Sequence, residues 1–356
     1  MRETRVGTVV VWVLENQTCL CRNAVHRVRR VAAALRALTR LRSETTRAAT
    51  ESTQSGWVNG RFTAMGIVAA MTDITIETIT TGLAFPECPR WREGRLWFSD
   101  IYRGVVLRLD PATGEVERVV EVPGQAGGLG FLPDGRLLVA SVQERKVYRL
   151  EDDGTLTVHA DLHGIAPWHL NDMAVDASGR AYVGNYGDDS APPAPPFPAD
   201  LAMVEPDGTA HVVATEMLFA NGMVITPDGA TLIVAETRAS PGRLTAFTIE
   251  ADGSLVNRRT LVEFDDAAVL PDGIALDAEG SVWVASPFNQ EVIRVTAAGE
   301  VAERIAVPHP YAVALGGEDG RDLFVCTADT WVPEDAIRIG GGAIRRLRVQ
   351  VPGAGF

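Results

Sequence analysis

A unit of roughly 40–50 residues recurs along most of this chain. Each copy combines a polar or glycine residue, an apolar stretch, an Asp-Gly, Glu-Gly or Ser-Gly turn and short β-rich segments. The copies start near Glu87, Gly128, Asn171, Asn221, Asp272 and Tyr311, at spacings of 39 to 51 residues. A repeat of this length with four short strands is typical of one propeller blade. The sequence therefore predicts an all-β fold, a six-bladed β-propeller with four-stranded blades.

One further strand precedes the first copy. Residues 74–79 alternate between apolar and polar side chains, as a half-buried strand does. We expect a strand near 74–80 to complete the last blade and close the ring. A proline-rich insertion at 186–200 interrupts the third copy, and it is either a lid over one mouth of the channel or a plain surface loop.

The first seventy residues differ from the rest in charge. They contain eleven arginines, no lysine and four glutamates, whereas the whole chain has a net charge of −13. The spacing over 26–42 predicts a basic amphipathic helix, a candidate for binding a partner or a membrane surface, and 43–56 has the composition of a linker. Our interpretation is that 1–70 is a basic extension, disordered or non-native, and that 71–356 is the propeller.

Composition narrows the classes of partner. The acidic balance argues against nucleic acid, which calls for a basic face. No apolar run approaches the ~20 residues that span a bilayer, so we expect no membrane partner. The four cysteines form neither a disulfide framework nor a zinc pattern. These features predict a cytoplasmic protein, a monomer or small homo-oligomer, acting on a small molecule.

Four copies begin with an oxygen-bearing side chain: Glu87, Asn171, Asn221 and Asp272. In a propeller, loops that precede the innermost strands face the central channel, so these side chains can converge on one point. Carboxylate and amide oxygens suit a hard divalent cation. The alternative is that Asn-Gly and Asp-Gly are simple turns. Separate turn signals later in the same copies, at 227–229 and 279–280, favour the site.

These motifs together resemble the SMP-30/gluconolactonase/LRE family, which includes regucalcin and bacterial sugar lactonases. The resemblance spans residues 74 to about 350. It is carried by Phe-Pro-Glu-Cys-Pro-Arg-Trp at 85–91, Leu-Asn-Asp at 170–172, Ala-Asn-Gly-Met at 220–223, Thr-Pro-Asp-Gly at 226–229, Ala-Glu-Thr at 235–237 and Leu-Pro-Asp-Gly-Ile at 270–274.

The resemblance implies a lactonase-type hydrolase that opens a sugar or other small lactone. One divalent metal would bind Glu87, Asn221 and Asp272, with Asn171 beside them, contacting substrate, water or the metal itself. Ca²⁺ is the expected cation, with Mg²⁺, Mn²⁺ or Zn²⁺ as substitutes. Asp272 would be the catalytic general base. The alternatives are a phosphotriester or other ester hydrolase at the same site, and a non-catalytic metal-binding or interaction propeller.

Several positions depart from the sugar lactonases or leave a role open. His169 stands where those relatives often carry arginine, which weakens the case for a sugar-acid substrate, and it is either a substrate-binding residue or a packed rim histidine. Asp172 is a second substrate-binding candidate, with orientation of Asn171 or a turn as alternatives. Cys88 replaces a common glycine, and we expect it to pack silently. Trp168 and Tyr311 are candidates for an apolar wall at the channel mouth.

Overall fold

The computed structural model describes residues 5–6, 9–10, 74–190 and 194–355. The chain divides into two units, Met1–Met71 and Thr72–Phe356. In the first unit, β1 (Arg5–Val6) pairs antiparallel with β2 (Val9–Val10). The basic helix and the linker predicted in this unit lie outside the described residues.

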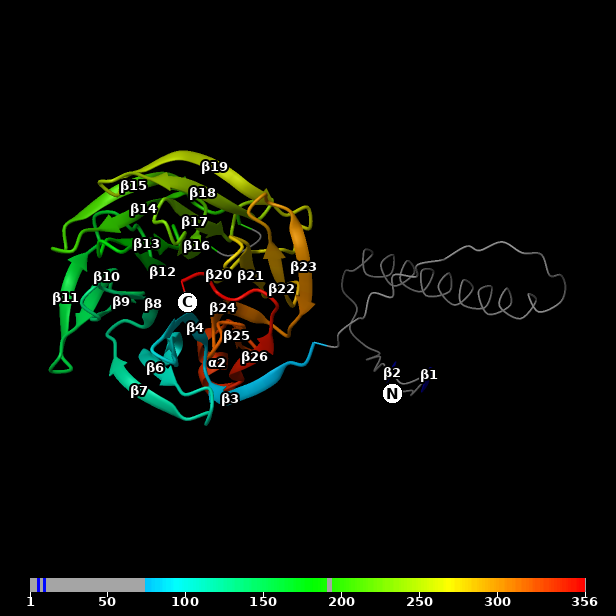
Figure 1. The fold of residues 1–356 in the computed structure, drawn as a ribbon. Helices are drawn as coiled ribbons and strands as arrows, with labels where there is room; N and C mark the ends of the chain where they lie inside the picture. The colour runs from blue at the N-terminus through cyan, green and yellow to red at the C-terminus, as the bar shows by residue number, and fades with distance from the viewer. Residues whose placement is uncertain (1–4, 7–8, 11–73, 191–193, 356) are drawn as a thin grey trace, which may run out of the picture. The chain divides into compact units, whose positions relative to one another are not determined.

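In the second unit, six four-stranded antiparallel sheets surround a central channel (Figure 1). We call them blades 1 to 6 and list each from its inner strand outward. Blade 1 consists of β4 (Pro86–Arg92), β5 (Arg95–Asp100), β6 (Val105–Leu109) and β7 (Val116–Glu121). Blade 2 consists of β8 (Ala126–Phe131), β9 (Leu137–Ser141), β10 (Lys146–Leu150) and β11 (Leu156–Asp161). Blade 3 consists of β12 (Leu170–Val175), β13 (Ala181–Asn185), β14 (Ala199–Val204) and β15 (Ala210–Met217).

The remaining blades repeat this order. Blade 4 consists of β16 (Ala220–Ile225), β17 (Thr231–Glu236), β18 (Arg243–Ile249) and β19 (Leu255–Glu263). Blade 5 consists of β20 (Ile274–Leu276), β21 (Val282–Ser286), β22 (Glu291–Val295) and β23 (Val301–Ala306). Blade 6 consists of β24 (Pro310–Gly316), β25 (Asp322–Thr327), β26 (Gly342–Arg348) and β3 (Glu77–Leu83). The predicted six-bladed β-propeller is confirmed.

The ring is closed as predicted, because β3 pairs antiparallel with β26. The strand begins three residues later than the alternation at 74–79 indicated. Glu77 is the first residue of β3 and pairs with Arg346, two residues before β26 ends at Arg348. β26 therefore extends beyond the first paired residue of β3, and residues 74–76 precede the ladder although they continue the same alternation.

The core lies between the blades. Six clusters of buried apolar side chains each join two neighbouring blades. Between blades 6 and 1, for example, Leu83 and Ile344 pack with Leu96 and Phe98, and all four are 5% exposed or less. Each blade therefore depends on both neighbours for burial of its two faces, as repeat architectures require.

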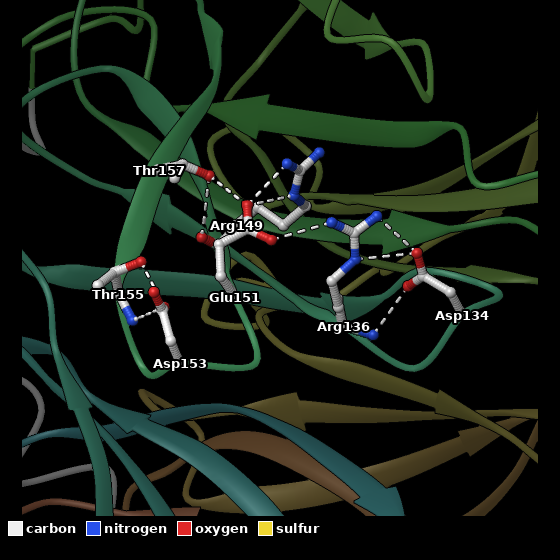
Figure 2. Close-up of polar contacts among 7 residues, drawn as sticks. All are labelled: Asp134, Arg136, Arg149, Glu151, Asp153, Thr155 and Thr157. Carbon is white, nitrogen blue, oxygen red and sulfur yellow. Dashed lines mark hydrogen bonds and ion pairs between the residues drawn. The ribbon is translucent and has the colours of Figure 1, made fainter.

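The predicted Asp-x-Gly turns adopt Asx geometry, in which the aspartate side chain accepts a bond from the backbone two residues on. In blade 2, the backbone N–H of Arg136 donates to Asp134 at 3.0 Å. The Arg136 side chain also bridges Asp134 and Glu151, which accepts further bonds from Arg149 and Thr157 (Figure 2). These bonds lower the pKa of Glu151 to about 2.

Two short helices in the connections were not anticipated. The 3₁₀ helix η1 (Ile101–Arg103) follows β5, and α2 (Pro333–Ile339) lies between β25 and β26. Pro333 at the start of α2 and Gly340 in a left-handed conformation at its end fit the usual helix-boundary preferences. Among the helices of the described residues, none has the length and apolar content needed to cross a membrane.

Leu83 tests the ring closure. Its side chain is 5% exposed and joins blades 6 and 1. We expect Leu83→Ala to lower the free energy of unfolding by about 2–5 kcal/mol, because it removes buried contacts from both blades. Thr81→Ala on the same strand is the control, since Thr81 is exposed, and its effect should stay within ~0.5 kcal/mol. Urea unfolding followed by tryptophan fluorescence measures both, and equal effects would contradict this account of closure.

Candidate metal centre

The structure brings the four oxygen-bearing residues to one end of the channel, which we call the front end. Glu87, Asn171 and Asn221 are each the second residue of an inner strand, in β4, β12 and β16. Asp272 lies two residues before β20 and donates its backbone N–H to Ala285 at 3.0 Å. All four are buried, with 5–9% of each residue exposed. They come from blades 1, 3, 4 and 5.

A β-bulge lies next to the three strand residues of this set. The register between the inner and second strands shifts between Glu87 and Arg90, between Leu170 and Met173, and between Ala220 and Met223. A bulge bends the strand and redirects a side chain, and bulges are over-represented beside functional sites. The same irregularity occurs in blades 2 and 6, between Ala126 and Leu129 and between Pro310 and Ala312, so it is a feature of the inner strands in general, and the side chains at this corner distinguish the four blades.

Close packing of neighbouring inner strands accounts for the Asn-Gly and Asp-Gly pairs. A Cβ atom on Gly222 would lie 2.6 Å from the backbone oxygen of Asp272, and one on Gly273 would lie 2.4 Å from the Cβ of Ala312. Each glycine therefore allows the next blade's backbone to approach. Asn221 is a strand residue, so the turn alternative does not apply to it.

The equivalent positions of blades 2 and 6 carry no oxygen ligand. In blade 2 the second residue of the inner strand is Gly127, one residue before the repeat start assigned from the sequence. Its carbonyl accepts a bond from the Ser99 hydroxyl at 2.6 Å. In blade 6 the position is Tyr311, which is 5% exposed. The candidate donors thus occupy four of six equivalent positions.

Hydrogen bonds hold two of the four side chains. The Asn221 amide donates to the Thr237 hydroxyl at 3.0 Å, and that hydroxyl donates to the Pro271 carbonyl at 2.7 Å. This relay joins blades 4 and 5 and leaves the Asn221 oxygen available to the channel. Glu87 accepts a bond from the backbone N–H of Cys88 at 2.9 Å. The side-chain nitrogen of Asn171 is buried without a hydrogen-bond partner in the described protein.

The two carboxylates are electrostatically unfavourable as they stand. Burial, and next the charge of Asp272, raise the pKa of Glu87 well above its usual value. Burial raises the pKa of Asp272 to about 8, against a lowering contribution from the Asn221 side chain. Removing an ionised carboxylate from water and placing a second one nearby both disfavour the charged form. A bound cation would reverse both effects.

The donor set fits a hard divalent cation. Within the described residues, no group of three or more His, Cys, Asp and Glu side chains is arranged to hold a metal ion. The candidate set combines two carboxylates with two amides, and so supplies only side-chain oxygens from Glu87, Asn171, Asn221 and Asp272. Such ligands suit Ca²⁺ or Mg²⁺ better than softer metals. The unpartnered Asn171 amide is a further sign that a group outside the chain completes this site.

Asp172 is engaged in an ion pair that the sequence did not reveal. Its Oδ1 accepts bonds from the Arg90 guanidinium at 2.5 Å and from the backbone N–H of Met173 at 2.8 Å. Arg90 reaches from blade 1 to blade 3 past the glycines of blade 2, since a Cβ on Gly128 would lie 2.5 Å from the Met173 nitrogen. These contacts favour a structural role for Asp172 over direct substrate binding.

His169 lies at the front mouth of the channel and is half-buried. Its ring stacks on Trp168 with 4.5 Å between centroids and meets Tyr186 edge-on at 6.2 Å. Burial, and next the charge of Arg145, lower the pKa of His169. His169 therefore faces the mouth as a neutral ring.

Cys88 and Glu236 are both buried. Cys88 packs with apolar side chains between blades 1 and 2, and burial raises the pKa of its thiol. Its φ of 50° is left-handed, which is the physical reason that glycine suits this position. Glu236 accepts bonds from Arg243, Thr245 and the Leu218 backbone. Its oxygens are therefore occupied within blade 4.

The 186–200 insertion is fastened to blade 4. Arg238, in the connection after β17, donates to the carbonyls of Ser190 and Ala194 at 2.5 Å each. Phe197 of the insertion is 63% exposed. The described part of the insertion therefore belongs to blade 3 by its chain connection and is held to blade 4 by Arg238.

A cavity of about 620 Å³ lies at the other, rear end of the channel. It is lined by the last residues of the inner strands, including Trp91, Phe131 and Ile225, and by Gly353–Gly355. None of the four candidate donors lines it. Arg90, which pairs with Asp172, is also one of the lining residues.

Comparison with known proteins identifies the group to which the chain is related. The family described as SMP-30/gluconolactonase/LRE-like region matches residues 85–329. A 6-deoxy-6-sulfogluconolactonase of Pseudomonas putida is 31% identical over 277 residues, which cover 75% of this chain and 92% of the relative. A pentonolactonase of Haloferax volcanii is 32% identical over 254 residues, which cover 70% and 84%.

Solved structures share the fold. A calcium-binding protein, regucalcin, from Agrobacterium tumefaciens superposes with a TM-score of 0.66 at 22% identity, covering 79% of this chain and 95% of that one. A gluconolactonase from Xanthomonas campestris gives a TM-score of 0.64 at 23% identity, covering 79% and 90%. The family match spans most of the propeller and confirms the resemblance found in the motifs. The chain belongs to the SMP-30/gluconolactonase/LRE-like family.

Proposed function

We propose that this protein is a lactonase, a hydrolase that opens a lactone ring with the help of a divalent cation at the front end of the channel. The observation that carries the proposal is the set of four buried oxygen-bearing side chains at matching positions of four blades. Relatives named as lactonases, at 31% and 32% identity, support this reaction class.

Glu87, Asn221 and Asp272 would hold the cation, with Asn171 beside it. When bound, the cation polarises the ester carbonyl and lowers the pKa of water. Its positive charge also favours the ionised form of Asp272, which a general base must be. Thr237 acts through Asn221, because its hydroxyl fixes the orientation of the Asn221 amide. The expected cation is Ca²⁺, with Mg²⁺, Mn²⁺ or Zn²⁺ as substitutes.

The hydrolysis follows from these side chains. Asp272 accepts a proton from the attacking water, whose oxygen bonds to the carbonyl carbon. The ring C–O bond then breaks, and the ring oxygen takes the proton to become the hydroxyl of a hydroxy acid. The unpartnered amide nitrogen of Asn171 is available to donate to the carbonyl oxygen as negative charge develops there.

Cation removal tests the site. We expect chelation by EDTA to abolish lactone hydrolysis and added Ca²⁺ to restore it. Calorimetry should give one binding site per chain. Glu87→Gln should weaken binding by more than ~100-fold, since loss of outer-shell partners alone typically costs 10–100-fold. Glu93→Gln is the matched control, because Glu93 is exposed at the rear end of β4. Full activity in the chelated protein would refute metal dependence and leave a metal-independent esterase as the alternative.

Asp272→Asn separates binding from proton transfer. The substitution keeps an oxygen donor of similar shape but cannot accept a proton, so we expect kcat to fall by about 10²–10⁴-fold. Calorimetry on the same variant measures how much cation affinity is lost. Comparison of kcat at saturating cation removes the contribution of weaker binding. A kcat close to that of the parent protein would show that another group is the base.

Thr237→Val tests the relay behind Asn221. Valine has nearly the same shape but neither donates to Pro271 nor accepts from Asn221, so the amide loses its orientation. We expect cation affinity to fall by about 10–100-fold, as for other outer-shell partners. Thr215→Val, on the exposed outer strand β15, should leave affinity as it was. Unchanged affinity in Thr237→Val would mean that packing alone orients Asn221.

A further inference from the structure

Aromatic rings surround the front mouth of the channel. We define the front collar as six residues from blades 1, 3, 4 and 6: Phe85, Tyr102, His169, Tyr186, Phe219 and Tyr311. Phe85 packs on Tyr102 and Tyr311 with ring centroids 4.8 and 4.6 Å apart. On the opposite side, Tyr186 packs on Phe219 at 4.3 Å. Tyr186 also packs, with Tyr102, against the buried cluster that contains Phe85 and Tyr311, so the collar is a continuous aromatic layer.

The chain path places the collar beside the candidate donors. Phe85, His169 and Phe219 each lie two residues before a donor, at Glu87, Asn171 and Asn221 respectively. Tyr311 occupies the donor position of blade 6.

A repeated backbone bond fixes these corners. The residue after the second strand donates to the residue before the inner strand, as in Tyr186 to His169 at 2.9 Å and Thr237 to Phe219 at 3.2 Å. The aromatic rings thus lie on the backbone corners that also position the donors.

The surface around the collar is apolar. Ile101, Val142 and Ala328 form a buried layer with Phe85 and Tyr311. Tyr102, His169, Tyr186 and Phe219 remain partly exposed to the mouth. Farther out, large exposed apolar side chains lie on the connections at this end: Trp168, Phe197 and Trp331 are 38%, 63% and 50% exposed. A molecule that enters the channel from the front meets mainly apolar and aromatic surface.

The arginines in these connections are bound to the protein itself. Arg145 donates to the carbonyls of Ala166 and Pro167. Arg103 donates to the Gly82 carbonyl and pairs with Asp100. Arg238 is 9% exposed in its side chain and holds the 186–200 insertion. Arg338 of α2 also pairs within the protein, with Asp335 at 2.6 Å, although its side chain is 69% exposed. An anionic sugar lactone requires a cation and many polar partners, and all four of these arginines have partners within the protein.

We propose that the site accepts lactones with an apolar alkyl or aromatic substituent, held by the front collar, in preference to polyhydroxylated or anionic sugar lactones. This inference rests on the proposed lactonase function and specifies its substrate. The lactone ring would lie at the candidate donors, and the substituent would lie against the partly exposed rings of Tyr102, Tyr186 and Phe219. Each buried methylene then adds about 0.8 kcal/mol, roughly fourfold in kcat/KM.

The experiment measures kcat/KM of the full chain with Ca²⁺ for γ-lactones with unbranched side chains of zero to five carbons, and for gluconolactone. We expect a rise of roughly fourfold per methylene over several carbons, with gluconolactone below the longer members. A flat series, or preference for gluconolactone, would overturn this inference while supporting the lactonase function. Hydrolysis of no lactone with any of the four cations would overturn the proposed function itself.

Variants assign the effect to the collar. Tyr186→Ala should lower the ratio of kcat/KM for γ-nonalactone over γ-butyrolactone by about tenfold or more, whereas Tyr186→Phe should keep it. Val158→Ala is the control, because this residue lies on the outer strand β11 of blade 2, away from the channel, and is 54% exposed. His169→Arg should shift preference toward an aldonolactone by adding a cation. Circular dichroism checks that each variant is folded, and an unchanged ratio in folded Tyr186→Ala would refute the role of the collar.

Discussion

Close backbone packing of the inner strands around the channel determines where side chains can be placed in this protein. Next to the candidate site, a Cβ on Gly222 would meet the Asp272 carbonyl at 2.6 Å, so the residue after the donor must lack a side chain there. The neighbouring bulge takes the donor out of the regular ladder and toward the channel. The site is therefore a consequence of how blades meet, and the glycine is as necessary to it as the asparagine.

The close packing of the inner strands also determines which buried carboxylates beside the channel have a positively charged partner. Asp172 is neutralised by Arg90, which reaches it because blade 2 has glycine at 127 and 128. Glu87 and Asp272 lack such a partner in the described structure, and burial raises the pKa of both. Of these three buried carboxylates, Asp172 is thus paired with an arginine, whereas the charged forms of Glu87 and Asp272 are disfavoured. A divalent cation is the simplest group that neutralises both.

The sequence predicted the architecture because a repeat with one strand pattern has few ways to bury its faces. The shared corner position of Glu87, Asn171, Asn221 and Asp272 was predictable for the same reason, since these residues recur at one position of the repeat, and their role as metal ligands stays a prediction. The start of β3 was placed three residues too early because the apolar–polar alternation begins at residue 74, before pairing with β26 begins at Glu77. Arg90 with Asp172 could not be foreseen, because the pair joins residues 82 apart across a third blade. Tyr186 and Thr237 each follow the second strand of their blade, at equivalent positions of the repeat. Comparison of the copies at this position would have pointed to both residues, whereas neither stands out when one copy is read alone.

The candidate donors and the collar occupy different positions of the same repeat. Under the proposed function, the residues that would bind the cation are therefore distinct from those that would select the substrate. Three candidate donors lie at the second position of an inner strand, beside a bulge, and Asn221 and Asp272 are followed by glycines that leave no room for a side chain. Most of the collar lies on the corner before that strand or after the next one, where bonds such as Tyr186 N–H to the His169 carbonyl involve only the backbone. Side chains at those corners can change without disturbing the donors. Under the proposed function, His169 and Tyr186 are positions at which substrate polarity would be set without altering the candidate donors.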